Sequence, residues 1–514
     1  MKVSKKLMYI IAAILTIISF VSMPKVYAAD KQNKITQDDM IYFIMTDRCN
    51  DGDESNNIDV NKNDPTAYHG GDFQGIIDKL DYIKGLGFTT IWITPVVKNQ
   101  PGGYHGYWAV DFYKTSENLG SIEKLKELVQ KAHLKGLKVI VDLVVNHTGI
   151  LDSWVTDPNY KDWFHDKVII SNYNNPQEVE NGWLSGLPDL KQENPEVKKY
   201  LIDMAKWWIN EVGLDGYRLD TMKHVSKTFW DEFVQEIKKD YPDFYFIGEV
   251  YSGDVSYVSD YQDTGVDGLM DFPAYYALTD VFKNGSPEMR LEDVINKTAN
   301  YKNRYLLGTF IDNHDVPRFV NNIDQFKNEK LEQALVFMMT YTGIPVMYYG
   351  TEIGLDGGAD PDNRRDMEWD SKSLISDYVK KLTSIRKSND ALTRGDIEVL
   401  QTDIDVLSYS RKFGDNIIIT VFNMLDSKNN VNIKIPGIEN GANGLLIDLL
   451  DSKNIKVKSG AASFKMLPSG VNVFSYKEDG MNYLIIIIPA AVVLLSAIVV
   501  LFLLNARRKK LSQL

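Results

Sequence analysis

The sequence predicts an α/β protein: a (β/α)8 barrel with an insertion after its third strand and an antiparallel β domain at its C-terminus. Between residues 40 and 394, short apolar strands alternate with amphipathic helical stretches, a rhythm typical of parallel sheets. About eight such units in roughly 350 residues favour a closed barrel. Beyond Arg394 the pattern changes to short alternating strands, which predicts a separate antiparallel domain.

Local periodicity gives the individual elements. Short apolar runs between turn residues predict strands, and apolar residues that recur every three to four positions predict helices. The expected barrel strands are 41–45, 89–94, 138–145, 216–220, 245–249, 268–270, 306–312 and 344–349, and the expected helices are 73–87, 124–135, 196–212, 229–237 and 331–339. The expected C-terminal strands are 406–409, 417–422, 431–435 and 471–476.

The domain plan follows from the places where this pattern changes. Residues 29–146 and 191–394 are expected to form the barrel, and residues 395–478 a β-sandwich domain. Residues 147–190 contain aromatics, Asn and Gly but no clear helical spacing, so we expect them to form an insertion subdomain.

Both termini carry apolar segments. Residues 1–28 have the basic start, the apolar run and the small-residue cleavage site of a signal peptide. Residues 484–504 are uncharged, apolar and long enough to span a bilayer. The basic tail 505–514 follows, which favours a cytoplasmic C-terminus. We therefore expect a single-pass protein at the extracellular face of the cell membrane, held by its C-terminal helix after removal of the signal peptide.

Charge and cysteine usage exclude several classes of partner and of stabilisation. Eight of the 57 basic residues lie in the terminal segments, so the body carries 49 basic residues against 70 acidic ones, a net charge of −21. This charge argues against a nucleic acid or an anionic membrane surface as partner. The only cysteine, Cys49, excludes an intrachain disulfide. We expect a monomer.

Four carboxylates follow or end predicted barrel strands: Asp142 (third), Asp220 (fourth), Glu249 (fifth) and Asp315 (seventh). The C-terminal ends of barrel strands open on one face, so these groups should meet in one cleft. Arg218 lies two positions before Asp220 and on the same side of an extended strand. Its charge keeps that carboxylate ionised, as a nucleophile requires. A purely structural ion pair is the alternative.

Carboxylates without a cysteine or a histidine cluster favour glycoside hydrolysis, which needs one ionised and one protonated carboxyl group. Glu249 has apolar neighbours along the chain and no adjacent cation, so its pKa should be raised, as a general acid requires. Asp315 follows His314 and is placed to hold substrate hydroxyls and to favour ring distortion.

Five segments, in this order along the chain, resemble the α-amylase family of glycoside hydrolases, which includes the cyclodextrin glucanotransferases. They are DLVVNH at 142–147, LPDL at 187–190, GYRLDTMKH at 216–224, GEV at 248–250 and FIDNHD at 310–315. A further match is YHGYW at 104–108.

The resemblance implies a retaining mechanism on α-1,4-glucans such as starch, maltodextrin or maltooligosaccharides. It implies that Asp220 is the nucleophile, Glu249 the acid/base and Asp315 the transition-state stabiliser. The residues that it places against the sugars are His105, Tyr107, Trp108, His147, Arg218, Lys223, His224 and His314. Tyr107 would be a stacking platform, with ordinary loop packing as the alternative, and Lys223 and His224 would line the leaving side.

The resemblance also implies calcium sites. The first joins the insertion to the barrel through Asn146, Asp189 and the carbonyl of His224. The oxygen-rich loop 51–57 can by itself wrap a hard cation or be a solvated turn, and it is not an EF-hand because Asn56 and Lys62 depart from that pattern. With the resemblance added, the loop predicts a second calcium site. Its ligands would be Asp51, Asp53, Asn56, Asn57, Gly70 and Asp72.

Hydrolysis is favoured over transfer because the glucanotransferase branch typically has a bulky aromatic residue four positions before Asp189, where this chain has Ser185. The chain also ends after one β domain before the apolar run. A glucanotransferase-like transferase is the first alternative. A non-catalytic, membrane-linked glycan-binding protein is the second, and the presence of all three acids argues against it.

Overall fold

The computed structural model describes residues 34–285, 289–371, 373–402, 405–435 and 443–478. Contacts divide the chain into two compact units, Met1–Lys34 and Ile35–Leu514, and the fold below belongs to the second. The expected signal peptide at 1–28, the expected membrane span at 484–504 and the basic tail at 505–514 lie outside the described residues.

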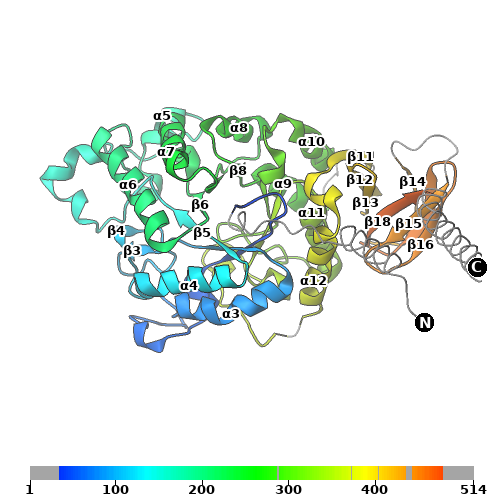
Figure 1. Ribbon diagram of the computed structural model, residues 1–514, viewed down its shortest axis with the longest axis horizontal. Coiled ribbons are helices and arrows are strands. Elements are labelled where there is room, and N and C mark those ends of the chain that lie inside the picture. The colour runs from blue at the N-terminus through cyan, green and yellow to red at the C-terminus, as the bar shows by residue number, and fades with distance from the viewer. Residues whose placement is uncertain (1–33, 286–288, 372, 403–404, 436–442, 479–514) are drawn as a thin grey trace, which may run out of the picture. The chain divides into compact units, whose positions relative to one another are not determined.

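The predicted (β/α)8 barrel is confirmed (Figure 1). An eight-stranded parallel sheet has the order β8-β7-β6-β5-β2-β1-β10-β9, and a parallel bridge between Met270 and Gly308 joins its two edges. The strands are β1 (Ile41–Ile44), β2 (Thr90–Ile93), β5 (Lys138–Leu143), β6 (Gly216–Leu219), β7 (Tyr245–Gly248), β8 (Gly268–Leu269), β9 (Gly308–Thr309) and β10 (Ile344–Tyr348).

Buried, unalternating strands form this sheet, as expected where helices cover a parallel sheet. All four residues of β1 are buried, and β1 pairs in register with β2 and β10. The closing edge depends on glycine. A Cβ at Gly268 would lie 1.9 Å from the Leu306 carbonyl oxygen, and one at Gly308 would lie 2.6 Å from a methyl group of Ile247.

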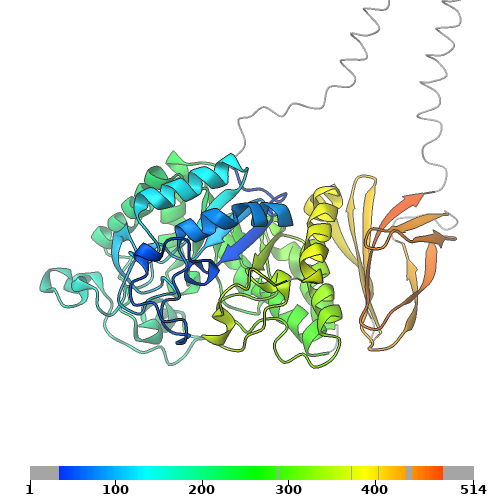
Figure 2. The ribbon, with the colours of Figure 1, turned by 90° about the horizontal axis from the view of Figure 1, so that it is seen from below.

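Helices follow the barrel strands, and α3 and α4 pack side by side outside the sheet (Figure 2). Helix α3 begins at its N-cap Asp72, whose carboxylate accepts from the Gly75 N–H, and ends at Gly87 with a left-handed φ of 101°. The α-helices are α2 (Thr46–Cys49), α3 (Phe73–Leu86), α4 (Ile122–Leu134), α5 (Pro176–Asn181), α6 (Pro195–Val212), α7 (Lys227–Asp240), α8 (Val255–Ser259), α9 (Phe272–Leu278), α10 (Met289–Lys297), α11 (Lys327–Thr340), α12 (Leu374–Lys387) and α13 (Asp390–Arg394).

The segment 147–190 has one short α-helix, α5, that the sequence did not predict, because six residues are too few for a helical period to be recognised. Its other helical turns are 3-10, and aromatic rings such as Trp154 and Trp163 pack against each other and against Tyr200 of α6. Between β2 and α4, β3 (Val97–Asn99) and β4 (Ala109–Thr115) form an antiparallel pair that was also not predicted.

The antiparallel C-terminal domain is confirmed. A six-stranded sheet has the order β11-β12-β13-β18-β15-β16, and β14 pairs with β17. Apolar side chains of both sheets, including Val431, Ile433, Ile419 and Phe474, form one core. The strands are β11 (Asp396–Thr402), β12 (Val406–Phe413), β13 (Asn416–Asn423), β14 (Asn429–Lys434), β15 (Gly444–Asp448), β16 (Asn454–Val457), β17 (Ala461–Met466) and β18 (Val471–Glu478).

The expected localisation through a membrane-spanning helix is corrected. A span needs about 20 consecutive, mostly apolar helical residues. The longest helix in the described part of the chain, α6, has 18 residues and carries charged side chains along its length. Among the described residues, none of the helices combines the length and the apolar character that a membrane crossing requires. This finding counts against the expected anchoring and localisation, and we propose neither.

Candidate active site

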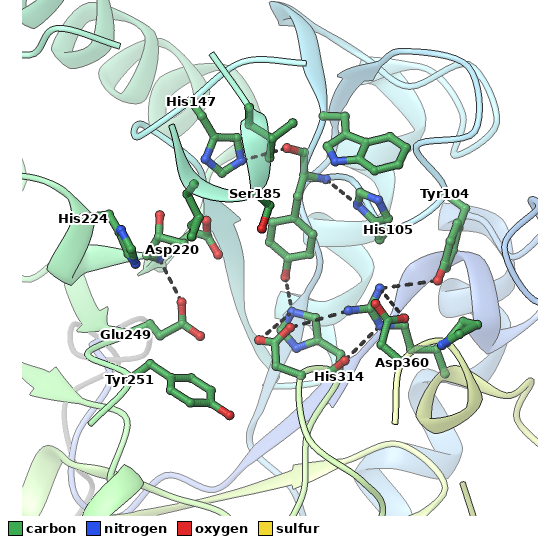
Figure 3. Close-up of a pocket in the computed structure, with 18 of the residues that line it drawn as sticks. Tyr104, His105, His147, Ser185, Asp220, His224, Glu249, Tyr251, His314 and Asp360 are labelled. Carbon is green, nitrogen blue, oxygen red and sulfur yellow. Dashed lines mark hydrogen bonds and ion pairs between the residues drawn. The ribbon is translucent and has the colours of Figure 1, made fainter. Parts of the chain in front are cut away.

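Ten of the residues predicted to act on substrate line one cavity of about 540 Å³ (Figure 3). The cavity opens where the barrel strands end, since Asp220 directly follows β6 and Glu249 directly follows β7. These ten residues are His105, Tyr107, Trp108, His147, Asp220, Lys223, His224, Glu249, His314 and Asp315.

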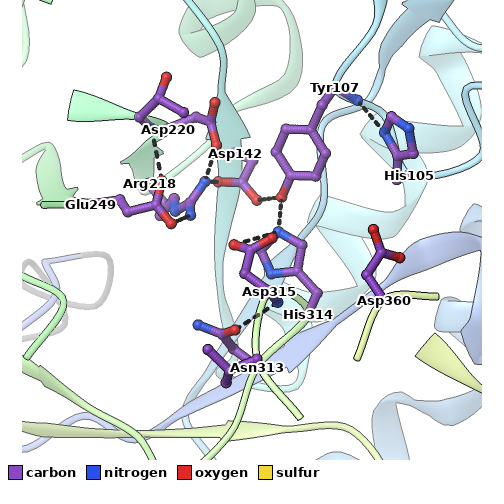
Figure 4. Close-up of polar contacts among 12 residues, drawn as sticks. His105, Tyr107, Asp142, Arg218, Asp220, Glu249, Asn313, His314, Asp315 and Asp360 are labelled. Carbon is purple, nitrogen blue, oxygen red and sulfur yellow. Dashed lines mark hydrogen bonds and ion pairs between the residues drawn. The ribbon is translucent and has the colours of Figure 1, made fainter. Parts of the chain in front are cut away.

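Arg218 is 1% exposed and contacts two of the carboxyl groups that line this cavity (Figure 4). Its Nη1 contacts Asp142 Oδ1 at 2.9 Å and Asp220 Oδ1 at 2.5 Å, and its Nη2 pairs with Glu249 Oε1. The neighbouring strands β5, β6 and β7 thus place three carboxylates around one guanidinium. These carboxylates raise the pKa of Arg218 well above its ordinary value, although burial opposes them.

The two carboxyl groups nearest the reaction centre differ in what holds them. Asp220 Oδ1 is bound to Arg218, but Asp220 Oδ2 is buried without a hydrogen-bond partner. Glu249 Oε2 accepts from the N–H of Thr221 at 2.9 Å. Thr221 has a φ of 45°, a costly conformation for a β-branched residue, and it turns the chain after Asp220 toward Glu249. One oxygen therefore remains free to react while the second carboxyl group is fixed.

Burial raises the pKa of Glu249 to about 8. The negative charges of Asp220 and Asp315 add to the rise, and the Arg218 guanidinium opposes it. The sequence predicted a raised pKa but also that Glu249 had no cation beside it. That second expectation is wrong, because Arg218 reaches Glu249 from the adjacent strand. At neutral pH Glu249 is therefore mostly protonated and can act as an acid.

Tyr107 links the carboxylate cluster to His314. Its hydroxyl group donates to Asp142 Oδ2 at 2.8 Å and lies 2.6 Å from His314 Nε2. The two rings stack with centroids 5.3 Å apart. Burial raises the pKa of Tyr107 well above its ordinary value and raises that of Asp142 to about 7. Tyr107 is thus a protonated, fixed ring at the wall of the cavity.

The four histidines of the cavity are neutral. Burial lowers the pKa of His105 to about 3 and that of His224 to about 4. Burial also lowers the pKa of His147 below its ordinary value and that of His314 well below it. His147 Nε2 lies 3.1 Å from the Tyr107 carbonyl oxygen, and the Tyr107 N–H donates to His105 Nδ1. Neutral rings can both donate and accept hydrogen bonds to sugar hydroxyls.

Asp315 faces a second arginine that sequence reasoning missed. Arg364 Nη2 lies 3.5 Å from Asp315 Oδ1, and Arg364 Nη1 lies 3.1 Å from Asp360 Oδ1. Arg364 and Asp360 both line the cavity, as does Tyr104. Asp360 and Arg364 lie in the loop after β10, the last strand of the barrel. The only sequence signal of this loop was its density of Asp and Arg residues.

Two aromatic residues, Tyr173 of the insertion and Tyr251 after β7, line the cavity on either side of Lys223 and were not predicted. Lys223 Nζ lies 5.7 Å from the Tyr173 ring and 5.6 Å from the Tyr251 ring, and it donates to the Tyr251 carbonyl oxygen. Tyr173 is 60% exposed and Tyr251 is 37% exposed, so both leave ring surface free for a ligand.

Two of the predicted ligands of the first calcium site have a side-chain oxygen without a partner. Asn146 Oδ1 and Asp189 Oδ1 are both buried without a hydrogen-bond partner. The main chains beside them pair, because the Leu190 N–H donates to the Asn146 carbonyl oxygen and His147 bridges with Asp189. His224 Nδ1 lies 3.1 Å from the carbonyl oxygen of Val179 in α5, so the insertion contacts His224. The donors fit a hard cation.

The predicted second site has three orphaned oxygens: Asp51 Oδ1, Asn56 Oδ1 and Asn57 Oδ1. A Cβ at Gly70 would lie 2.6 Å from Asn57 Oδ1 and 2.9 Å from Asp51 Oδ2, so only glycine leaves the space open. The remaining predicted ligands are engaged elsewhere. Asp72 accepts from the N–H groups of Gly52, Asp53 and Gly75 and from Asn56 Nδ2, and Asp53 Oδ1 accepts from Ser55.

Among the described residues, no three His, Cys, Asp or Glu side chains come together in a way that could hold a metal ion. Both candidate calcium sites therefore depend on amide and carbonyl oxygens as well as carboxylates, a donor set that suits Ca²⁺ rather than a transition metal.

Comparison with known proteins gives a consistent result. Residues 43–395 match the family described as "Alpha amylase, catalytic domain". The chain is 39% identical over 457 residues to the Beta/alpha-amylase of Paenibacillus polymyxa, which covers 85% of this chain and 37% of that protein. It thus spans little more than a third of that relative's length. It is 33% identical to a cyclomaltodextrin glucanotransferase of Bacillus sp. (strain 38-2), over 89% of this chain and 69% of the relative. The crystal structure of an Anoxybacillus α-amylase superposes with a TM-score of 0.82 at 46% identity, covering 86% and 98% of the two chains.

Proposed function

The chain belongs to the α-amylase family of glycoside hydrolases, and on that premise we propose that it is a retaining hydrolase of α-1,4-glucosidic bonds in starch-like polysaccharides and maltooligosaccharides. One observation carries this proposal. A single guanidinium, that of Arg218, contacts both the carboxylate with a free oxygen, Asp220, and the carboxyl group with the raised pKa, Glu249.

The spacing of these groups supports retention. Retaining enzymes hold their two carboxyl groups about 5–5.5 Å apart, whereas inverting enzymes leave about 6.5–9.5 Å for a water molecule. Asp220 and Glu249 contact the two Nη atoms of one guanidinium, which holds the two carboxyl groups close together and favours the shorter spacing. Asp220 can then reach the anomeric carbon directly.

In the first step, Asp220 Oδ2 attacks the anomeric carbon while Glu249 donates its proton to the glycosidic oxygen. The bond between that carbon and that oxygen breaks, and the leaving sugar departs with its new hydroxyl group. Arg218 retains its contact with Asp220 Oδ1 and so keeps the nucleophile oriented. The product of the step is a covalent glycosyl ester of Asp220.

In the second step, Glu249, now ionised, takes a proton from a water molecule. The water oxygen attacks the anomeric carbon and displaces Asp220, which regenerates both starting groups with retention of configuration. The Thr221 N–H holds Glu249 in position through both proton transfers.

Substrate contacts are assigned by position in the cavity. Asp315 accepts hydrogen bonds from sugar hydroxyls and supports distortion of the ring in the transition state. The neutral rings of His105, His147 and His314 bind hydroxyl groups, and Tyr107 and Trp108 offer aromatic surface. Lys223 and His224 lie on the side of Glu249 and would line the leaving sugar.

Ser185 supports hydrolysis over transfer. It lines the cavity, is exposed and has a φ of 52°. A small residue there leaves the cavity open to water. Transfer is the second candidate, since the glucanotransferase relative matches most of this chain.

The test is a product profile by chromatography after incubation of the purified protein with starch and, separately, with maltoheptaose. Short linear maltooligosaccharides with rising reducing ends are expected. Cyclic or elongated products with few new reducing ends would assign the chain to the transferases, and no products from either substrate would leave only a binding function.

We also propose Ca²⁺ at both candidate sites. At the first, Asn146, Asp189 and the carbonyl of His224 would hold it. At the second, Asp51, Asn56 and Asn57, whose side-chain oxygens lack a partner, would hold it beside Gly70, whereas Asp53 and Asp72 are engaged elsewhere. At both sites the role of the ion would be structural. At the first it would join the barrel to the insertion, and at the second it would hold the loop 51–57 against Gly70. A ligand that binds only the folded protein raises its stability, so strong chelator should lower the melting temperature. An unchanged melting curve would contradict the proposal.

A further inference from the structure

Each hydrogen-bonding group of His165, a residue of the insertion, has a polar partner. Its ring Nδ1 lies 2.6 Å from Asp189 Oδ2, and its Nε2 lies 2.9 Å and 3.2 Å from the two carboxylate oxygens of Glu193. Its N–H donates to the Asp189 carbonyl oxygen at 3.0 Å, and its carbonyl oxygen accepts from Trp183 Nε1 at 3.1 Å. The side chain is 10% exposed. The two ring contacts therefore fix the rotation of the ring, and the two main-chain contacts fix the backbone that carries it.

The contact with the His165 ring determines which carboxylate oxygen of Asp189 lacks a partner. Because His165 engages Oδ2, the other oxygen, Oδ1, is the one left buried without a partner. Asn146 Oδ1 is in the same condition, and the two residues belong to paired segments. The contact with the ring sets the rotation of the carboxylate and thereby decides which oxygen is offered to a cation.

The main chain of His165 leads to the wall of the reaction cavity. Trp183, whose indole N–H is bound to the His165 carbonyl oxygen, directly precedes Leu184 and Ser185, and both line that cavity. The Trp183 N–H also donates to the Val168 carbonyl oxygen at 2.8 Å. One residue thus contacts both a candidate metal ligand and the loop that forms part of the cleft.

We propose that His165 is a positioning residue for the first calcium site, and that through Trp183 it couples occupation of that site to the shape of the cleft wall at Ser185. This inference rests on the calcium site proposed above, because without a cation the orphaned oxygens of Asn146 and Asp189 have nothing to bind. Groups that orient a metal ligand typically change metal affinity by about 10- to 100-fold when removed.

Three substitutions separate the two contacts of the ring. In H165N the amide nitrogen takes the place of Nδ1 and keeps the contact with Asp189. In H165Q it takes the place of Nε2 and keeps only the contact with Glu193, and H165A loses both. Calcium affinity is measured by isothermal titration of CaCl₂ into chelator-treated protein, together with thermal melts in chelator. We expect H165N to bind calcium within about threefold of wild type, and H165Q and H165A to bind roughly 10- to 100-fold more weakly.

His133 supplies a matched control. Its Nε2 lies 2.7 Å from the buried Asp215 Oδ2, so H133A also breaks a histidine–aspartate contact. Asp215 precedes β6 and so lies at the opposite end of the barrel strands from the candidate site. H133A should lower the melting temperature in chelator while leaving calcium affinity unchanged.

The coupling to the cleft has its own readout. Calcium should slow proteolysis of the segment 147–190 in wild type and in H165N but much less in H165Q, and H165Q should show a raised KM for maltoheptaose. Equal calcium affinity in wild type and the three His165 variants would overturn the positioning role, as would equal weakening of calcium binding in H165N and H165Q. If the wild-type protein binds no calcium, both the proposed calcium site and this inference are wrong. The product profile judges the hydrolase proposal independently.

Discussion

Arg218 of the barrel and Arg411 of the C-terminal sheet are both fully buried, but the partners of Arg218 are charged and those of Arg411 are neutral. Arg218 contacts Asp142, Asp220 and Glu249. Arg411 contacts main-chain carbonyl oxygens, those of Gly395, Thr340 and Tyr341. Carboxylates raise the pKa of Arg218 well above its ordinary value, whereas burial among neutral groups lowers that of Arg411 to about 10.

The difference separates a site that reacts from a site that holds the fold. Around Arg218, three carboxylates share one cation, so one carboxyl group can remain protonated and another can keep a free oxygen. Around Arg411, the guanidinium satisfies carbonyl groups at the C-terminal end of α11, where helices leave such groups without partners. Burial alone therefore does not identify function; the charge of the partners does.

The largest effect should come from Asp220. D220N removes the nucleophile while keeping its shape, and we expect turnover of maltoheptaose to fall on the order of 10⁴-fold or more. The far-UV circular dichroism spectrum and the melting curve serve as controls for folding. Substantial residual activity in correctly folded D220N would show that this carboxylate is not the nucleophile.

R218K tests the shared cation. A single ammonium group cannot make the forked contacts of a guanidinium, so Glu249 and Asp220 lose their common anchor. We expect kcat/KM to fall about 10²- to 10³-fold, comparable to the loss of one preorganised charge contact in other enzymes. Activity within about threefold of wild type would contradict a catalytic role for the cluster.

R411K is the matched substitution in the C-terminal sheet. It leaves buried carbonyl oxygens without donors, at a cost of about 1–3 kcal/mol in the free energy of unfolding. Activity per folded molecule should remain within about twofold of wild type. The measurements are denaturant unfolding and the maltoheptaose assay. A loss of kcat/KM as large as that of R218K would contradict the assignment of Arg411 to a purely structural role.

The last prediction concerns the pH dependence of stability. In the folded protein the pKa of Glu249 is raised from 4.5 to about 8. Between these values the folded state holds a proton that the unfolded chain has lost, so the contribution of Glu249 to stability falls as pH rises. It falls by no more than about 1.4 kcal/mol per pH unit. E249Q should therefore gain stability relative to wild type as pH rises from 5 to 8. A difference that stays constant or shrinks would contradict the raised pKa.

The strand ends were predictable because their signals are local. Apolar runs that finish in charge located Asp220 and Glu249 directly after β6 and β7, and the spacing of Arg218 and Asp220 indicated their contact. The contact between Arg218 and Glu249 was not predictable in this way, since the two residues lie on different strands. The same holds for Arg364 and Asp360, which reach the cavity from a loop with no regular pattern.

By itself, the sequence determined the barrel with its eight strands, five of its helices, the presence of an antiparallel domain and the types of side chain at the strand ends. These follow from periodicities of two and 3.6 residues, which depend only on near neighbours along the chain. Only the tertiary structure decided which oxygen of Asp220 and of Asp189 lacks a partner, and how far burial raises the pKa of Glu249. Solvent exclusion and charge pairing are set by groups brought together from distant segments, and no local pattern records them.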